Sequence, residues 1–227
     1  MGGYYEDKLQ GNRLKRCYEI APPRIQQYLK AEIQYIVKNV RPDCQLLELG
    51  CGYGRVLRPL AQKVAWVFGI DTSHANLKLA RTVLEDRHAC HLVRMDAVKM
   101  GFSDGRFDYV ICIQNGISAF HVDQRTLVRE SIRVTKEHGL IFFSSYSTKV
   151  WPARLQWFEA QAKAGLVGEI DWQRTGEGNI VCKDGFTATT VSQEGFTRLV
   201  RGFPVDVRIE EVDESSIFCV LTAHKAT

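Results

Sequence analysis

The fold class is decided by the stretch QLLELGCGYGR, residues 45–55. Its first half is apolar enough for a buried strand, and the second half holds three closely spaced glycines and ends at Arg55. A strand that runs into glycines and then into a helix brings bare backbone and a helix N-terminus up to a ligand. Residues 45–55 therefore predict a ligand-binding loop after the first strand of an α/β sheet.

Short β-rich runs alternate with helical stretches on both sides of this loop. Near-continuous apolar runs are typical of strands whose two faces are both buried. Ser73 is a good N-cap for one connecting helix, and Asp123 precedes another over Gln124–Lys136, which Gly139 is expected to end. The alternation predicts a parallel sheet covered by helices. The predicted strands are Gln45–Leu49, Val64–Asp71, Cys90–Met95, Phe107–Ile113 and Leu140–Ser145.

The flanks of this core add three further parts to a single predicted domain. Upstream, Pro22-Pro23 opens an amphipathic helix within an N-terminal helical arm over residues 1–42, before a core over 43–146. Residues 147–191 interrupt the alternation of strands and helices and predict an inserted cap, with a helix over Val150–Lys163 and a hairpin at Asp184-Gly185. Residues 192–227 predict a helix (Gln193–Arg201) and two final strands (Val205–Val212 and Ile217–Ala223).

Composition excludes several classes of protein. The chain has 227 residues, of which 45% are hydrophobic and 25% charged, and this is typical of one ordinary globular domain. No apolar run reaches the ~18 residues of a membrane helix, and the N-terminus lacks the apolar core of a signal peptide. Seven separated cysteines without a CxxC pair indicate reduced thiols, so we expect a cytoplasmic protein. A net charge of +4 without a dense basic stretch gives no reason to expect nucleic acid binding.

Two carboxylates follow the second and third predicted strands. Asp71 ends the second strand, where its side chain could accept hydrogen bonds from both hydroxyls of a ribose. Asp96 ends the third, where a carboxylate and the next backbone N–H could bind the edge of an adenine. A dinucleotide-binding loop would place a third glycine where Arg55 stands, and a P-loop would need Gly-Lys-Ser/Thr, which is missing. The pattern therefore favours an adenosine-containing ligand that is not a dinucleotide, and a nucleotide-dependent oxidoreductase is the weaker alternative.

The segments ELGCGYGR, FGIDTS, VRMDA and FDYVICIQN together resemble the class I, seven-stranded, Rossmann-like S-adenosylmethionine-dependent methyltransferases of the small-molecule type. The resemblance is specific over Gln45–Ser145. It implies a doubly wound, mostly parallel seven-stranded sheet with an antiparallel final strand, an N-terminal helical arm and a cap inserted after strand 5. It also implies S-adenosyl-L-methionine as the cofactor. The positions that the resemblance assigns to the cofactor are Glu48, Gly50, Cys51, Gly52, Gly54, Asp71, Thr72, Asp96, Ala97, Ile113 and Gln114.

The resemblance leaves the methyl acceptor open. The Asn-Pro-Pro-Tyr signature of nucleic acid amino-methylating enzymes is absent after the fourth strand, so we expect a small-molecule acceptor. A regulatory module that binds the cofactor without turnover, or a tRNA or protein methyltransferase, remains the alternative. We expect no metal, no membrane partner, and a monomer or homodimer.

The remaining candidate residues lie outside the motifs. Arg24 could pair with the carboxylate of the cofactor, His121 and Tyr146 are candidate catalytic residues, and Tyr5, Tyr18 and Trp151 are candidate substrate contacts. The aromatic arm around Tyr4–Tyr18 has no long apolar stripe of its own. We therefore expect this arm and the 147–191 cap to close over the open edge of the sheet as a lid.

Overall fold

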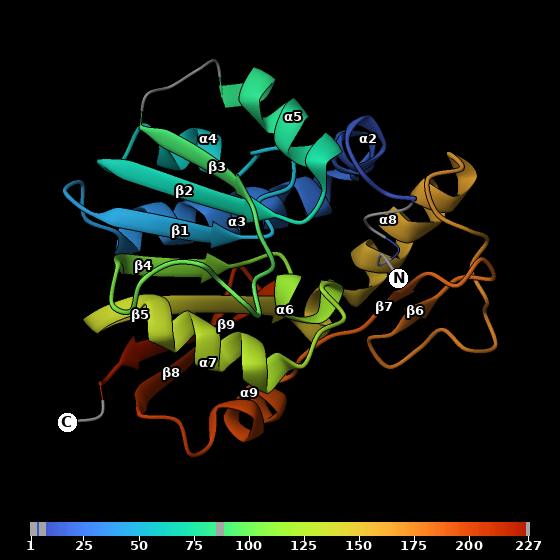
Figure 1. Cartoon of the computed structure of the whole chain (residues 1–227). Helices are drawn as coiled ribbons and strands as arrows, with labels where there is room; N and C mark the ends of the chain where they lie inside the picture. Colours follow the sequence, from blue (N-terminus) through green and yellow to red (C-terminus); the bar gives the residue numbers. More distant parts are fainter. Residues whose placement is uncertain (1–3, 5–7, 85–88, 226–227) are drawn as a thin grey trace.

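The computed structural model describes residue 4, residues 8–84 and residues 89–225. Its main feature is a seven-stranded sheet of order β3-β2-β1-β4-β5-β9-β8, in which β9 runs antiparallel to both β5 and β8 and the other pairs are parallel (Figure 1). The predicted fold class is confirmed. The strands are β1 (Gln45–Leu49), β2 (Trp66–Asp71), β3 (Cys90–Arg94), β4 (Phe107–Cys112), β5 (Thr135–Tyr146), β8 (Val205–Val212) and β9 (Ser216–Ala223).

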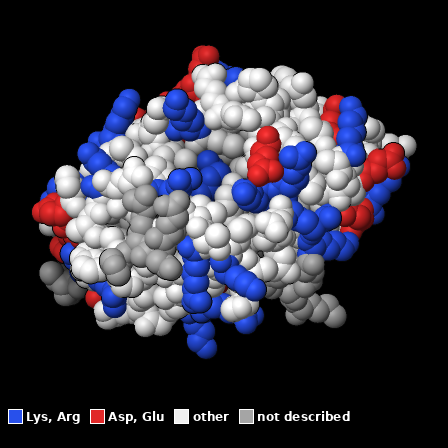
Figure 2. Space-filling view, turned by 90° about the horizontal axis from the view of Figure 1, so that it is seen from above, with Lys and Arg blue, Asp and Glu red and all other residues white. Residues whose placement is uncertain are grey.

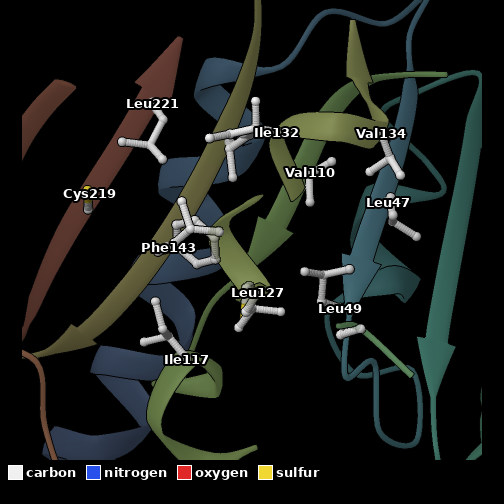
Figure 3. Packing of buried hydrophobic residues seen from close by; sticks show 14 of the residues in the cluster. Leu47, Leu49, Val110, Ile117, Leu127, Ile132, Val134, Phe143, Cys219 and Leu221 are labelled. Atoms are coloured by element: carbon white, nitrogen blue, oxygen red, sulfur yellow. The ribbon is translucent and has the colours of Figure 1, made fainter. Parts of the chain in front are cut away.

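Helices cover both faces of this sheet. Apolar residues of α3, α4 and α5 pack on one face, and those of α6, α7 and α9 pack on the other. Figure 3 shows the second of these layers, where Leu127 and Ile132 of α7 face Val110 and Phe143 of the sheet. The helices are α2 (Asn12–Glu19), α3 (Pro23–Asn39), α4 (Leu57–Leu60), α5 (His74–Leu84), α6 (Gly116–Ala119), α7 (Gln124–Val134), the 3-10 turn η1 (Thr148–Val150), α8 (Trp151–Lys163) and α9 (Gln193–Val200).

A third apolar cluster lies beyond the sheet and joins the N-terminal segment to residues 150–188. Leu9 and Cys17 pack there with Trp157, Phe158 and Phe186, all of them buried. The indole N–H of Trp157 donates to the carbonyl oxygen of Cys17 at 2.8 Å. The hairpin predicted at Asp184-Gly185 is present as β6 (Ile180–Val181) and β7 (Thr187–Ala188). The N-terminal segment is therefore packed against the inserted segment through an apolar core of its own.

The junction between α7 and β5 differs from its prediction. The helix ends at Val134 and the strand begins at once with Thr135, so Gly139 lies within the strand and does not end the helix. A Cβ atom on Gly139 would lie 2.9 Å from the carbonyl oxygen of Asp108. The glycine is needed because β4 and β5 approach closely at a bulge, where the register shifts between Phe107 and Tyr109.

The helices, the cysteines and the basic surface side chains can be compared with the expectations about membrane, thiol state and nucleic acid. No helix among the described residues is long and apolar enough to cross a membrane. The seven cysteines are free thiols. The Lys and Arg side chains on the face seen in Figure 2 lie in separate groups with uncharged surface between them.

Candidate active site

A cavity of 470 Å³ opens at the carboxyl ends of β1, β2 and β4. Its walls come from the glycine loop, the ends of β2 and β3, the segment after β4, and the N-terminal residues Tyr4, Leu14 and Tyr18. β1 has β2 on one side and β4 on the other, so the strand order reverses at this point. Open α/β sheets bind ligands at such a switch point.

The glycine loop forms the floor of this cavity. Gly50 and Gly52 have φ values of +67° and +54°, which side-chain-bearing residues rarely adopt. A Cβ atom on Gly50 would lie 2.4 Å from Cε1 of Phe120. The backbone N–H of Cys51 donates to Ile70 O at 2.9 Å and so ties the loop to β2. The loop can therefore present bare backbone to a ligand only with glycine at position 50.

Asp71 organises the neighbouring wall. One carboxylate oxygen accepts a hydrogen bond from Gly52 N at 2.9 Å, and the other accepts from Ser73 N at 2.8 Å and from Asn76 Nδ2 at 3.2 Å. Asn76 is buried, and its Oδ1 accepts from Gly11 N at 2.7 Å. Neither Ser73 nor Asn76 is predicted as a site residue, although the N-cap at Ser73 signals where the helix begins. Asp71 is thus linked through Asn76 to the N-terminal segment.

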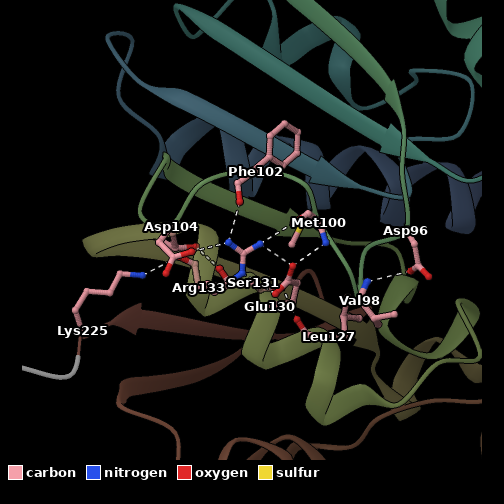
Figure 4. Close-up of polar contacts among 11 residues, drawn as sticks. Asp96, Val98, Met100, Phe102, Asp104, Leu127, Glu130, Ser131, Arg133 and Lys225 are labelled. Atoms are coloured by element: carbon pink, nitrogen blue, oxygen red, sulfur yellow. Dashed lines mark hydrogen bonds and ion pairs between the residues drawn. The ribbon is translucent and has the colours of Figure 1, made fainter.

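Asp96 and Ala97 lie at the start of the β3–β4 connection, which Arg133 of α7 holds in place (Figure 4). The guanidinium of Arg133 donates to Met100 O and Phe102 O, both at 2.8 Å, and forms ion pairs with Glu130 and Asp104. These hydrogen bonds hold the pKa of Glu130 below its usual range. Arg133 therefore positions the connection that carries Asp96, and nothing in the sequence pattern indicates this role.

Two buried carboxyls lie at or beneath the cavity. Burial raises the pKa of Glu48, at the end of β1, to about 8, and that of Glu32, on α3, to about 7; the charge of Arg55 opposes both shifts. Oε2 of Glu48 has no hydrogen-bond partner within the described chain. Glu48 lines the cavity, so a cationic group of a ligand could supply the missing charge.

The segment after β4 forms the far wall. Gln114 and Asn115 both have left-handed φ values, of +57° and +61°. Gln114 N donates to Glu32 Oε2 at 3.0 Å and to Ser144 Oγ at 2.8 Å, and Asn115 Nδ2 donates to Thr189 O at 2.8 Å. This turn is therefore fixed from both the sheet and the inserted segment.

Most of the predicted site residues line the cavity, and the others lie in different places. Tyr18 and the exposed His121 line the cavity, and Tyr146 lines a smaller chamber beside it. Tyr5 lies outside the described residues. The predicted cofactor positions that line the cavity are Glu48, Gly50, Cys51, Gly52, Asp71, Thr72, Asp96, Ala97, Ile113 and Gln114.

Three predicted residues lie elsewhere. Arg24 pairs with Asp213 in the β8–β9 turn at 2.8 Å, so the assignment of Arg24 to a cofactor carboxylate is corrected. Trp151 packs against Arg154 and lines neither the cavity nor the chamber. Gly54 is also absent from the lining, and its α-carbon faces Ala80 of α5.

Comparison with known proteins agrees with this geometry. Residues 46–139 match the model of a methyltransferase domain family. The fold resembles that of a putative S-adenosyl-L-methionine-dependent methyltransferase from Methanococcus maripaludis, with a TM-score of 0.66 and 16% identity over 100% of this chain and 99% of that chain. The chain has the class I methyltransferase fold, and residues 46–139 match the methyltransferase domain family. The cofactor of this class of domain is S-adenosylmethionine.

Curated relatives match over part of their length. A ubiquinone biosynthesis O-methyltransferase of Colwellia psychrerythraea is 29% identical over 143 residues, which cover 60% of this chain and 57% of the relative. An arsenite methyltransferase of Mus musculus is 30% identical over 146 residues, which cover 58% of this chain and 38% of the relative. The chain thus spans about half the length of the curated relatives it matches, and the names of these relatives give them different acceptors.

The cavity of the methyltransferase domain fits the cofactor on chemical grounds. The bare backbone at Gly50 and Gly52, the Asp71 carboxylate beside them and the unpartnered Glu48 oxygen match a ligand with a ribose and a cationic centre. Asp96 is exposed and its Oδ1 caps Val98 N at 3.0 Å, so Oδ2 stays available for an adenine amino group. All these groups surround one space of 470 Å³, in the range of small-molecule sites.

Proposed function

We propose that this chain transfers the methyl group of S-adenosylmethionine to a small-molecule acceptor. One observation carries the proposal: the Gly52 N–H donates to the Asp71 carboxylate and so joins the glycine loop to the end of β2. Both parts line a cavity that Asp96 and Glu48 also line. The names of the relatives, which point to ubiquinone biosynthesis and to arsenite, support a small acceptor. A cytosolic location and the absence of a nucleic acid partner remain predictions from composition.

The bound cofactor supplies an activated methyl group on a sulfonium. The residues of this chain then orient it and exclude water. We assign Asp71 to the ribose, Asp96 and Ala97 to the adenine, and the 50–52 backbone to the methionine portion. Gln114 and Ile113 form the wall where the methyl group would face the acceptor. His121 is exposed at the mouth of the cavity, and a role as general base for it is a prediction.

Replacing Asp71 by alanine tests the proposal. S-adenosylhomocysteine should bind the parent chain with 1:1 stoichiometry by calorimetry, and Asp71→Ala should weaken it by roughly 10- to 100-fold, the effect of losing a charged hydrogen-bond partner. Asp43→Ala, an exposed carboxylate at the opposite end of β1, is the matched control and should leave affinity unchanged. Unchanged affinity in Asp71→Ala would remove this carboxylate from the site, and absent binding in the parent chain would refute the proposed function.

Cofactor binding should depend on pH through Glu48. Its pKa of about 8 leaves the carboxyl mainly protonated at pH 6–7, and a cation placed beside it favours the ionised form. Binding of S-adenosylmethionine should therefore release a proton from Glu48 at pH 6–7 and tighten as the pH rises towards 8. Calorimetry in two buffers of different ionisation enthalpy measures the release.

Glu48→Gln is the control, because titration of the ligand itself is common to both proteins. The variant should lack the part of the proton release that belongs to Glu48. Because the raised pKa also makes the free folded protein lose stability as the pH rises between 4.5 and 8, Glu48→Gln should flatten that decline too. Equal proton release in both proteins would contradict the assignment.

A further inference from the structure

A small chamber adjoins the cofactor cavity on the side of the inserted segment. Its volume is 50 Å³, and Leu14, Tyr18, Gln114 and Ala119 line both spaces. One water molecule needs roughly 10–15 Å³ of such volume, and an engineered cavity of about 150 Å³ binds benzene. The chamber therefore has room for about three or four non-hydrogen atoms and not for an aromatic ring.

The walls of the chamber come from the N-terminal segment, the segment after β4 and the inserted segment. Trp157, Phe158 and Tyr146 supply aromatic surface, and Gln114, Gln161 and Thr187 supply neutral polar groups. Among the described residues, no Asp, Glu, Lys, Arg or His lines it. The remaining lining residues are Leu9, Leu14, Cys17, Tyr18, Asn115, Ala119 and Ala188.

The titratable groups that line the chamber hold their protons at neutral pH, and the carboxyl of Glu32 does not reach the lining. Burial raises the pKa of Cys17 to about 12, and burial also raises the pKa of Tyr146. Glu32 is held behind the chamber by the Gln114 N–H, and its pKa is about 7. An alcohol acceptor would need a base at the reacting oxygen, and the chamber wall offers none.

Two opposite charges lie behind the Tyr146 wall of the chamber, the guanidinium of Arg154 and the carboxyl of Glu32, so neither sign of charge dominates there, and the uncharged wall itself decides which ligand it can hold. The fully buried guanidinium of Arg154 lies 4.3 Å from the centre of the Tyr146 ring and donates to Gly178 O and Ala188 O. The amide nitrogen of Gln114 is buried and has no hydrogen-bond partner in the described part of the chain, so it can donate to an anion. Methylation of a neutral amine would instead leave a new positive charge, and no carboxylate of the described residues lines the chamber to balance it.

We infer that the acceptor is a small thiol, which enters the chamber as its thiolate and is methylated on sulfur. The inference rests on the proposed function. The thiol loses its proton to solvent before it binds, so no base is required, and its lone pair forms the new carbon–sulfur bond. The old methyl–sulfonium bond breaks, and its electron pair leaves with the cofactor sulfur as a neutral thioether. The aromatic walls suit polarisable sulfur better than a strongly hydrated carboxylate.

The test uses the full chain with S-adenosylmethionine and a panel of acceptors that each have four non-hydrogen atoms, with the larger catechol as the comparison for size. Mass spectrometry should detect the methyl thioether from 2-mercaptoethanol, with at least tenfold less product from ethylene glycol, ethanolamine, acetate or catechol. The rate should rise with pH in parallel with the thiolate fraction of the acceptor, so hydrogen sulfide, a smaller acceptor with a lower pKa, should shift the profile to lower pH.

Two variants separate the chamber from the cofactor cavity. Ala188 lines only the chamber, so Ala188→Leu should lower kcat/KM for the thiol at least tenfold without changing the affinity for S-adenosylhomocysteine, whereas Ala188→Ser should keep both. Phe158→Leu should enlarge the chamber and improve turnover of a bulkier thiol. If the chain binds the cofactor but yields no thiol product, or methylates catechol faster than the thiol, the thiol inference is wrong while the proposed function stands. Failure to bind the cofactor would instead overturn the proposed function.

Discussion

Gly50→Ala is expected to weaken binding of S-adenosylhomocysteine by at least about a hundredfold, or ~2.7 kcal/mol. The φ of +67° at this position makes any side chain unfavourable, by roughly 1–2 kcal/mol. The new Cβ atom would also lie 2.4 Å from Phe120, a residue that lines the cavity, so the loop or the ring must move. Isothermal calorimetry measures the loss directly.

Gly165→Ala is the matched control for backbone strain. Gly165 has a φ of +66°, but nothing lies within 4 Å of the position that its Cβ atom would occupy. This variant should lower the melting temperature slightly and leave cofactor affinity intact. Adding Phe120→Leu to Gly50→Ala should recover part of the affinity, because it removes the clash but not the strain. If Gly50→Ala and Gly165→Ala behave alike, the close approach of the loop has no role in binding.

Features determined by neighbouring residues are those that could be predicted from the sequence. The strands, the Ser73 and Asp123 caps and the glycine loop depend on short-range patterns, and all are present in the structure. Apolar runs show which strands are buried, and the resemblance fixes the order in which they pair. The position of Asp71 follows in the same way, because it directly ends a buried strand.

Features that depend on distant partners could not be predicted. Arg24 pairs with Asp213, which lies 189 residues further along the chain and carries no motif. Arg133 serves the cofactor site only because Met100 O and Phe102 O lie within its reach. The expectation for the N-terminal arm was incomplete for the same reason. Its residues bury apolar surface against α3 and also against Trp157, which lies 140 residues beyond Cys17 in the sequence.

The structure suggests how this arm would act as a lid. On the cofactor side, Gln10 Oε1 accepts from Ser73 Oγ at 2.6 Å, and Gly11 N donates to Asn76, which in turn donates to Asp71. On the other side, Arg13 donates to Gly165 O at 2.7 Å. The arm therefore bridges the ribose-binding wall and the inserted segment, although closure itself remains a proposal.

Removing residues 1–11 is expected to lower the affinity for S-adenosylhomocysteine at least tenfold and to speed its dissociation. The truncation removes the contacts to Ser73 and Asn76 together with Leu9 of the third apolar cluster, but it keeps α2, whose Cys17 packs with Trp157 in that cluster. A deletion through residue 18 would remove Cys17 as well, so loss of the lid could no longer be separated from unfolding. Stopped-flow fluorescence measures the dissociation rate, and thermal unfolding checks that the fold is retained.

Trp157→Phe is the gentler companion to this truncation, because it removes the N–H that holds Cys17 O and keeps a smaller aromatic ring in the cluster. It should loosen the arm without removing it, and cofactor dissociation should speed up by a smaller factor. Hydrogen exchange over residues 12–19 should slow when S-adenosylhomocysteine binds, since the cofactor would steady Asp71 and, through Asn76, the arm. Unchanged exchange over α2, together with parent-like dissociation after truncation, would show that the arm only covers the core.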